Sequence, residues 1–492
     1  MFNFFKRKQG KEPPKKQRGY DGASRGRLTS DWFPGSMSAD MEINSSLTIL
    51  RNRSRDMVRN NPYAVNAQRI VRNNVVGVGI GFQSQIKDDK GQLINDLNTE
   101  IEEKFRYWCR KQNCHTAGLL SLNEICQVIM NECFEAGEII IRKVYKAFGD
   151  SYVPYALEVI EADRLAEQYS RPVDSSGRSV RMGVERDQWG RPTAYYFHRT
   201  HPGDLIFGGG ISEMDLVRVP AKEIFHLYIM ERFPQTRGIP WMHSAIRRLR
   251  DTGGYTEAEI VAARASANIA GFIRSEASDE APEDKEGEVF QIKPGAFLHL
   301  APGEDVTPFT PNRQTAAIEP FMRFMIREIA AGIGVSYESL SRDYSQSNYS
   351  SSRLSLLDDR VVWRILQGWL ISNFLQRVFK DWMDMAVLSG ELKLPNYEQD
   401  PRRYCQIRFR PPGWSWIDPT KEVQAYKEAV KAGFMTVGDV IAQTGQGSDF
   451  EDTMKARRAE LDLMDSMNLS FDTNGTSRSE PSPVRTDGDN NE

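Results

Sequence analysis

The chain has 492 residues, a length typical of roughly three domains at ~100–200 residues each. Hydrophobic residues make up 40% and charged residues 27%, so the chain can bury a sizeable core and is not disordered overall. Lys and Arg total 64 against 67 Asp and Glu, a net charge of −3. This balance argues against a protein that coats nucleic acid by neutralising phosphates, although it allows one past which nucleic acid slides.

The five cysteines include no CxxC pair, a pattern typical of a reducing compartment and not of a disulfide scaffold or a strong zinc site. No apolar run approaches the ~18 residues of a membrane span. The N-terminus lacks the apolar segment of a secretory signal. We therefore expect a soluble protein that is intracellular when made and has no membrane partner.

The two ends of the chain differ from the middle. Residues 1–30 hold nine Lys or Arg and two acids, which predicts a flexible basic arm. Residues 470–492 are rich in Ser, Asp, Asn and Pro, which predicts a disordered tail. Between them the patterns predict an α+β body.

The first part of the body begins with helices and continues with strands. Asn61-Pro62 predicts a helix start, with the end near Gly77, and Ser121 with Glu124 predicts a capping box for a helix that stops at Gly137. Another helix is expected around 97–108. The strands that we expect are 138–144, 156–160, 183–186, 194–198 and 223–229, with a turn at 187–190.

Two long helices then flank an insert. Residues 243–274 contain no proline and predict a helix ~45 Å long, in which Gly253-Gly254 is a candidate position for a kink. The second helix, 318–335, has apolar residues at helical spacing. The insert, 275–317, has an acidic stretch and β-like pieces around 289–292 and 296–300. Such helices are hard to bury in one globule, and a ring of copies would cover them.

A polar segment, 336–352, precedes a third long helix, 353–389, predicted to span ~55 Å and to stop at Gly390. Eight of the 17 residues in the polar segment are serine, and we expect a loop with an N-cap at Ser350 or Ser351. Three short helices are expected after Asp418, Thr436 and Asp449.

The sequence has few signs of catalysis, and no cofactor or metal is expected. There is no GxxxxGK[ST] loop for a nucleoside triphosphate, and Gly77–Gly81 is interpreted as a strand, because no helix follows it. No nucleophile elbow surrounds Ser345–Ser352, and the acidic stretch lacks EF-hand spacing, which favours a solvated turn. Residues 419–445 are a weak helix-turn-helix candidate, because the second helix has no Lys or Arg.

Several motifs follow one another along the chain. They are Arg53-x-Arg55-Asp56 with Asn60-Asn61-Pro62-Tyr63-Ala64, Glu161-Ala162-Asp163-Arg164-Leu165, Gly183-Val184-Glu185, Ile224-Phe225-His226-Leu227, Arg232-x-x-Gln235-x-Arg237-Gly238, Arg327-x-Ile329-Ala330-Ala331-Gly332-Ile333-Gly334-Val335-Ser336-Tyr337, Asp343-Tyr344-Ser345 with Asn348-Tyr349-Ser350, and Asp418-Pro419. In this order they resemble the lambda-type family of bacteriophage portal proteins. The resemblance covers about residues 45–465.

The resemblance implies a portal fold and a structural function. Family members form a dodecameric ring at one capsid vertex. Double-stranded DNA is packaged through the ring by a separate terminase and is later ejected through it. The resemblance implies a wing at 31–242 and 353–418, stem helices at 243–274 and 318–335, a clip at 275–317, a tunnel-loop segment at 336–352 and a crown at 419–469. The implied partners are other copies of the chain, the terminase large subunit, the major capsid and scaffold proteins and the head-completion or neck proteins. The implied location is the virion, with assembly in the host cytoplasm.

The resemblance also implies two functional segments and no catalytic residue. Residues of the tunnel loop would face the DNA channel: Arg342, Tyr344, Ser345, Gln346, Ser347, Asn348 and Tyr349. Acids of the clip would face the terminase and the neck: Glu280, Glu283, Asp284, Glu286 and Glu288. Two alternatives without a functional contact remain. The tunnel-loop residues would then form a loop buried between subunits, and the acidic stretch would be only a spacer. The alternative functions are a DNA-processing enzyme, either a terminase-like nuclease or a serine hydrolase, and a sequence-specific DNA-binding module.

Overall fold

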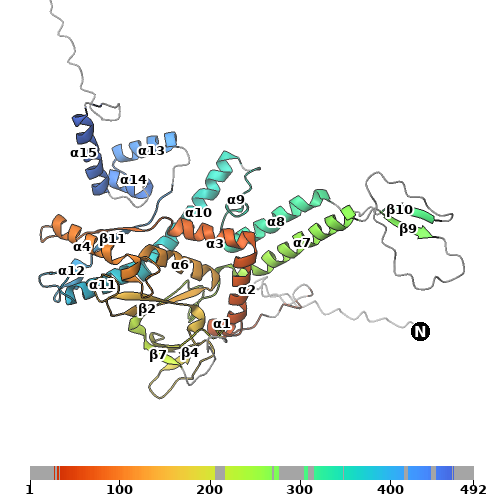
Figure 1. Ribbon diagram of the computed structural model, residues 1–492, viewed down its shortest axis with the longest axis horizontal. Helices are drawn as coiled ribbons and strands as arrows, with labels where there is room; N and C mark the ends of the chain where they lie inside the picture. The colour runs from red at the N-terminus through yellow and green to blue at the C-terminus, as the bar shows by residue number, and fades with distance from the viewer. Residues whose placement is uncertain are drawn as a thin grey trace, which may run out of the picture.

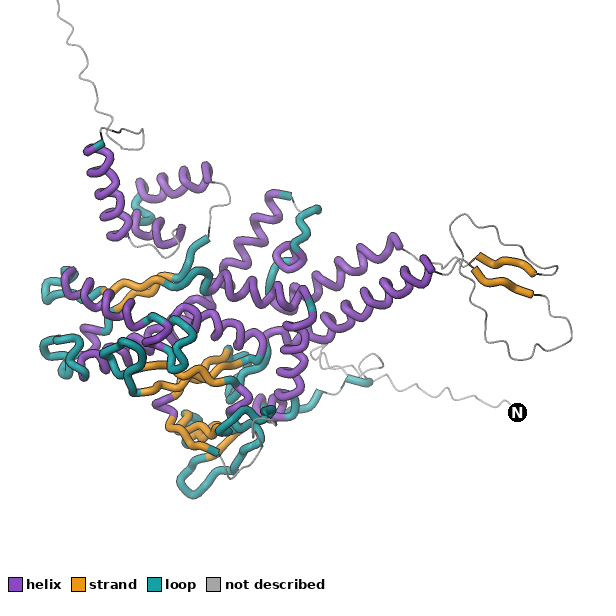
Figure 2. Tube along the Cα trace, viewed as in Figure 1, coloured by secondary structure: helices purple, strands orange, loops and turns teal. Residues whose placement is uncertain are grey.

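The computed structural model describes residues 27, 30–32, 34–204, 216–268, 271–275, 304–308, 315–346, 348–414, 419–444, 450–467 and 469. Helices surround small antiparallel sheets in the body, and one pair of long helices projects from it (Figures 1 and 2). This mixture of helices and sheets confirms the α+β class. None of the described helices is long and apolar enough to cross a membrane.

Local capping signals set the helices of the first part of the body. Asn61 Oδ1 accepts from the N–H groups of Tyr63 and Ala64, so the helix begins at Pro62 as predicted. The Ser121–Glu124 capping box is present as well. The helices are α1 Ala39–Asn44, α2 Leu47–Asn60, α3 Pro62–Val75, α4 Asn95–Trp108, α5 Lys111–Cys114 and α6 Leu122–Glu135.

Three small sheets follow the expected strands and add others. The central sheet has the order β3-β2-β8, the second β4-β5-β6-β7, and the third pairs β1 with β11, all antiparallel. The strands are β1 Gly81–Ser84, β2 Glu138–Val144, β3 Ala156–Ile160, β4 Ser179–Arg181, β5 Val184–Arg186, β6 Pro192–Phe197, β7 Val217–Pro220, β8 Ile224–Tyr228 and β11 Ile407–Arg410. The five predicted strands are confirmed as β2, β3, β5, β6 and β8.

The interpretation of Gly77–Gly81 as a strand was wrong for most of its length. Gly77 has a φ of +54° and the turn after α3 continues through it, so β1 begins only at Gly81. Gly77 ends the helix here because a positive φ suits a residue without Cβ.

The two long helices, α7 Ile246–Asn268 and α8 Thr315–Ile333, lie side by side and project from the body (Figure 1). Arg248 pairs with Glu328 at 2.9 Å, and the rings of Tyr255 and Phe321 lie 5.0 Å apart. Gly253 and Gly254 do not interrupt α7.

The predicted first long helix was too long at both ends. Residues 243–244 belong to the 3-10 turn Trp241–Ser244, where the indole Nε1 of Trp241 donates to the carbonyl of Ile333 and fixes the turn against α8. Residues 271–274 lie in β9 Gly271–Ser275, because their backbone pairs with β10 Glu304–Pro308. The β-like pieces expected at 289–292 and 296–300 lie outside the described residues.

The third long helix is confirmed, with one irregular turn. It consists of α10 Tyr349–Leu370, a π-helical turn Ile371–Leu375 and α11 Gln376–Leu388, and Gly390 follows with a φ of +78°. Its N-cap is Asn348 and not Ser350 or Ser351, because Asn348 forms a capping box with Ser351. Short helices α9 Tyr337–Ser341 and α12 Pro401–Tyr404 flank this run.

The three C-terminal helices are confirmed as α13 Pro419–Lys431, α14 Val437–Thr444 and α15 Phe450–Ser466. The main hydrophobic core lies elsewhere and extends through α3, α4, α6, β2, β8, α8, α10 and α11. One part of it is an aromatic cluster between α4 and α11. There the ring of Phe105 lies 5.6 Å from Trp108, 5.1 Å from Phe379 and 4.9 Å from Trp382. This aromatic cluster joins the long helix to the first half of the chain.

Candidate functional site: the 342–349 loop and a buried ion network

Side-chain hydrogen bonds hold the residues that follow α9. Arg342 caps α9 with a φ of +59°. The carboxylate of Asp343 accepts from the hydroxyl of Ser345 at 2.6 Å, the N–H of Ser345 at 3.0 Å and the hydroxyl of Tyr337 at 2.9 Å. Hydrogen bonds from Ser345, followed by that from Tyr337, lower the pKa of Asp343 to about 2. The carboxylate is therefore ionised at neutral pH and holds the turn together.

Most of the predicted channel residues are exposed in the single chain. Tyr344, Ser345 and Gln346 are exposed, which agrees with the expectation that so polar a loop meets water. Ser347 lies outside the described residues, and only the backbone of Tyr349, the first residue of α10, is described.

Three residues of the loop bond to helices. The guanidinium of Arg342 donates to Asn66 Oδ1 on α3 at 3.2 Å, and Gln346 Oε1 accepts from Arg323 on α8. Asn348 Oδ1 accepts from the N–H of Ser351 at 2.8 Å. Arg342, Gln346 and Asn348 thus all have structural partners, while Tyr344, Ser345 and Gln346 remain exposed.

The base of the loop is fixed from two sides. Asn66 Nδ2 donates to the carbonyls of Ser339 and Leu340 at 3.0 and 2.8 Å. On the other side the buried carboxylate of Asp359, on α10, accepts from the hydroxyl of Ser336 at 2.7 Å. The α9 segment is therefore held between α3 and α10, and the loop leaves the body at a defined position.

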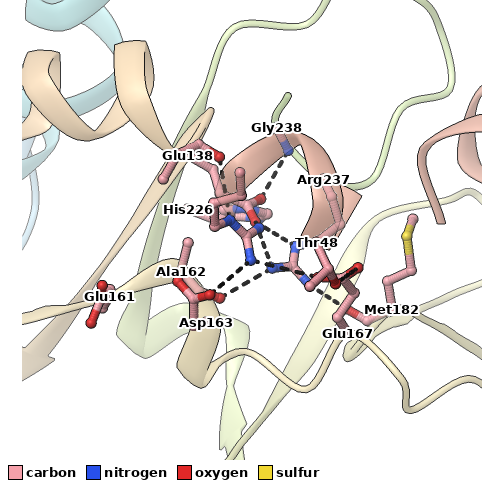
Figure 3. Close-up of polar contacts among 12 residues, drawn as sticks. Thr48, Glu138, Glu161, Ala162, Asp163, Glu167, Met182, His226, Arg237 and Gly238 are labelled. Carbon is pink, nitrogen blue, oxygen red and sulfur yellow. Dashed lines mark hydrogen bonds and ion pairs between the residues drawn. The ribbon is translucent and has the colours of Figure 1, made fainter. Parts of the chain in front are cut away.

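A buried ion network centres on Glu138, the fully buried first residue of β2 (Figure 3). Its carboxylate accepts from Arg237 Nε at 2.7 Å, Arg51 Nη2 at 3.1 Å and the N–H of Gly238 at 2.9 Å, and lies 2.8 Å from His226 Nε2. Burial by itself raises the pKa of Glu138. The nearby Arg237 and His226 lower the pKa by more than burial raises it, so it lies well below its ordinary range.

The network extends through the arginines to other segments. Arg51 lies 3.5 Å from both Asp163 and Glu167, while Arg237 donates to the carbonyls of Met182 and Ala162 at 2.9 and 3.2 Å. Arg55 pairs with Asp163 at 2.6 Å and with Glu161 at 2.9 Å. Residues from α2, β2, β8 and the segment before α7 are therefore joined in one cluster.

Sequence reasoning did not identify this cluster. Five of its members lie in the motifs quoted above, namely Arg55, Glu161, Asp163, His226 and Arg237. A further signal was Glu138, a carboxylate followed directly by three isoleucines, because a buried charge requires partners. Those motifs are scattered over 180 residues, so only the fold brings them together.

Two glycines let the chain pass close to the cluster. A Cβ on Gly137 would lie 2.3 Å from the carbonyl carbon of Ile239, and a Cβ on Gly238 would lie 2.1 Å from the carbonyl oxygen of Gly137. The segment that leads into α7 therefore crosses the start of β2 in direct backbone contact, and the network holds the base of the projecting pair.

The described residues contain one group with the ligand types of a metal site. Ligand atoms of Glu161, Asp163 and His201 lie within 4.8 Å of one another. The guanidinium of Arg55 already pairs with both carboxylates, so the arrangement is that of an ion pair.

The enzyme and DNA-binding alternatives gain no support in the part of the chain that the structure describes. The hydroxyl of Ser345 donates to the carboxylate of Asp343. A nucleophilic serine is instead activated by an adjacent general base such as histidine. The α14 helix has no Lys or Arg with which to contact bases.

The five acids predicted to lie in the clip are outside the described residues: Glu280, Glu283, Asp284, Glu286 and Glu288. Of the segment 275–317, the structure describes Ser275, the last residue of β9, strand β10 and the start of α8. The β9–β10 pair lies beyond the far ends of α7 and α8 (Figure 1).

Comparison with solved structures finds similar chains in particles of a gene transfer agent. One, in the neck of the empty particle, has a TM-score of 0.49 and 15% identity and covers 80% of this chain and 94% of that chain. Another, in the virion of the native particle, has a TM-score of 0.46 and covers 85% of this chain.

Curated relatives match over nearly the whole length. The probable portal protein of Halomonas phage phiHAP-1 is 29% identical over 96% of this chain and 92% of its own length. Portal protein B of Escherichia phage lambda is 23% identical over 90% of this chain and 91% of its own. The model of the phage portal protein, lambda family, matches residues 25–367, well over half of the 492 residues. The chain therefore belongs to the lambda family of phage portal proteins, a family of structural proteins.

Proposed function

We propose that the chain forms the portal ring at one vertex of a capsid, through which double-stranded viral DNA is packaged and later ejected. The observation that carries the proposal is the family match over residues 25–367. In this function the protein is a conduit, and a separate terminase hydrolyses the nucleotide. The near-neutral net charge of −3 supports a conduit, because a strongly basic lining would hold phosphates instead of letting them move.

The architecture supports an assignment of parts. The α7–α8 pair has the shape of a stem, and the β9–β10 pair beyond it fits the clip (Figure 1). The body, 31–242 with 353–418, fits the wing, and the helices within 419–469 fit the crown. The loop at 342–349 fits the tunnel loop, since it is polar, its residues 344–346 are exposed, and it is held at its base. We place the protein in the virion, in contact with the major capsid, scaffold and neck proteins.

Negative-stain electron microscopy of the purified full chain tests the ring. We expect rings of about twelve copies with a central hole wide enough for duplex DNA. A stable monomer at micromolar concentration, with no rings on the grid, would overturn the proposal.

The acidic part of the insert is proposed as the surface that meets the terminase large subunit. Deleting 283–288, which includes Glu283, Asp284, Glu286 and Glu288, should leave the ring intact and weaken terminase binding. Terminase binding to purified rings is the measurement, and unchanged binding would mean that the stretch is only a spacer.

A further inference from the structure

The α10 helix is apolar on two sides. Trp363, Leu366 and Leu370 are buried in the core. Leu354, Leu357, Val361 and Ile365, at spacings of 3, 4 and 4, form an outward stripe in which these side chains are 62%, 43%, 56% and 67% exposed. The outward face of a helix on a monomeric protein is normally polar. A continuous exposed apolar stripe of this kind marks an interaction surface.

A second, chemically different apolar surface lies on the projecting pair. Phe324 and Phe321 on α8 are 64% and 44% exposed, and Phe321 rests against Tyr255 of α7. Aromatic side chains at such a position are typical anchors of protein interfaces. The chain thus carries an aliphatic surface and an aromatic surface on different elements.

Both surfaces have exposed charges beside them: Arg364 as well as Asp358 on α10, and Glu328 as well as Arg327 on α8. Asp358 lies within the α10 stripe, one turn from Leu354. Arg327 lies one turn from Phe324 and stacks on Tyr337, with 5.3 Å from its guanidinium carbon to the ring centroid. Within the described ranges, neither residue forms an ion pair at 4.0 Å or less. A contact between the two surfaces would therefore bring two unpaired opposite charges, Asp358 and Arg327, together.

Two unlike surfaces on one chain are what a head-to-tail ring requires, because each subunit offers one surface to each neighbour. We propose that the α10 stripe of one subunit packs on the Phe321–Phe324 surface of the next copy, with Asp358 facing Arg327. This inference rests on the proposed ring and adds which surfaces close it.

A mixing experiment tests the interface with two variants of the full chain. Variant A carries Leu357→Glu and Ile365→Glu on α10, and variant B carries Phe321→Glu and Phe324→Glu on α8. Each variant alone should be a folded monomer by light scattering and circular dichroism. An equimolar mixture should give a 1:1 dimer and no ring, because one intact stripe meets one intact aromatic surface. Val173→Glu with Leu388→Glu, also on exposed apolar residues, is the control and should form wild-type rings.

The charge pair gives an independent test. Asp358→Arg and Arg327→Asp should each lower the fraction of protein in rings at least tenfold, and the double variant should restore it.

Three outcomes would overturn the inference while leaving the ring itself standing: variants A and B that still form wild-type rings, a variant B that dimerises alone through α10, or a mixture that stays monomeric. Failure of the proposed function is distinguishable, because then the wild-type chain itself would form no ring.

Discussion

At the scale of single residues, the fold depends on a few buried charges that are fully paired. Glu138 has no exposed surface and is in contact with Arg51, Arg237 and His226. A buried ion pair adds little net stability over apolar packing, but removing one partner leaves a charge with nothing to replace water. The cluster therefore makes the packing of α2, β2 and the base of α7 depend on each member.

Arg237→Met is expected to lower the free energy of unfolding by about 3–5 kcal/mol, because Glu138 loses its closest partner while remaining buried. Denaturant unfolding of the purified chain measures the change. Arg232→Met is the control: Arg232 pairs with Glu42 at the surface, so its loss should cost only about 0–1 kcal/mol. Equal losses in the two variants would contradict the importance assigned to the network.

Glu132, on α6, provides a pH-dependent prediction. Burial, and next the neighbouring Glu135, raises its pKa to about 7, and its Oε2 atom has no hydrogen-bond partner among the described residues. The unfolded carboxyl titrates near 4.5, so between 4.5 and about 7 the folded state binds more protons and stability falls as pH rises.

Glu132→Gln should therefore be more stable than the wild type by up to about 3 kcal/mol near pH 8, with the difference vanishing toward pH 4.5. Thermal and denaturant unfolding across this range measure it. Glu103→Gln, on the exposed side of α4, should change little at any pH. A difference between Glu132→Gln and the wild type that does not vary with pH would show that the carboxyl is not buried as described.

At the scale of elements, the junction between α6 and β2 decides how the body meets the projecting pair. Gly137 ends α6 with a φ of +90°, and Gly238 passes directly over it. Both positions exclude a side chain, so backbone contact sets the distance between β2 and the segment that leads into α7.

Gly137→Ala should cost more than about 3 kcal/mol of folding free energy, because the positive φ and the collision with Ile239 add to each other. Gly190→Ala is a matched control with a φ of +78° and no atom within 4 Å of the new Cβ, so only the conformational cost of about 1–2 kcal/mol should remain. Similar stabilities of the two variants in urea unfolding would mean that the junction tolerates a shift.

At the scale of the whole molecule, the proposed function requires a polar surface that touches DNA without holding it. Ser345 and Gln346 are exposed and neutral, and such groups make weak, sequence-independent contacts with phosphate. Asn348 is unsuitable for a charge substitution, since it caps α10 and its replacement would also destabilise the helix.

Gln346→Lys should leave the ring intact and slow DNA packaging, most strongly at low salt, because phosphate attraction is then least screened. The measurement is packaging rate against ionic strength, with Gln346→Glu as the matched control of opposite charge. Coincident curves for the lysine, glutamate and wild-type proteins would show that the loop does not meet the DNA.

The amino-acid sequence by itself determined those features that depend on neighbouring residues. Asn61 before Pro62, the Ser121–Glu124 box and Gly390 set helix ends through contacts within one turn, so these ends were predicted correctly. The order of the motifs also indicated the family, and with it the proposed function.

Only the tertiary structure decided what depends on residues far apart in the chain. The β1 strand exists because it pairs with β11, more than 300 residues later. The four residues of β1 are too few and too mixed in polarity to predict that partner. Glu138 is stable in the core only because α2, β8 and the chain before α7 each bring it a donor. The sequence likewise did not reveal which apolar residues of α10 are exposed. The helix is apolar on two sides, and hydrophobic periodicity does not distinguish a core face from an interface face.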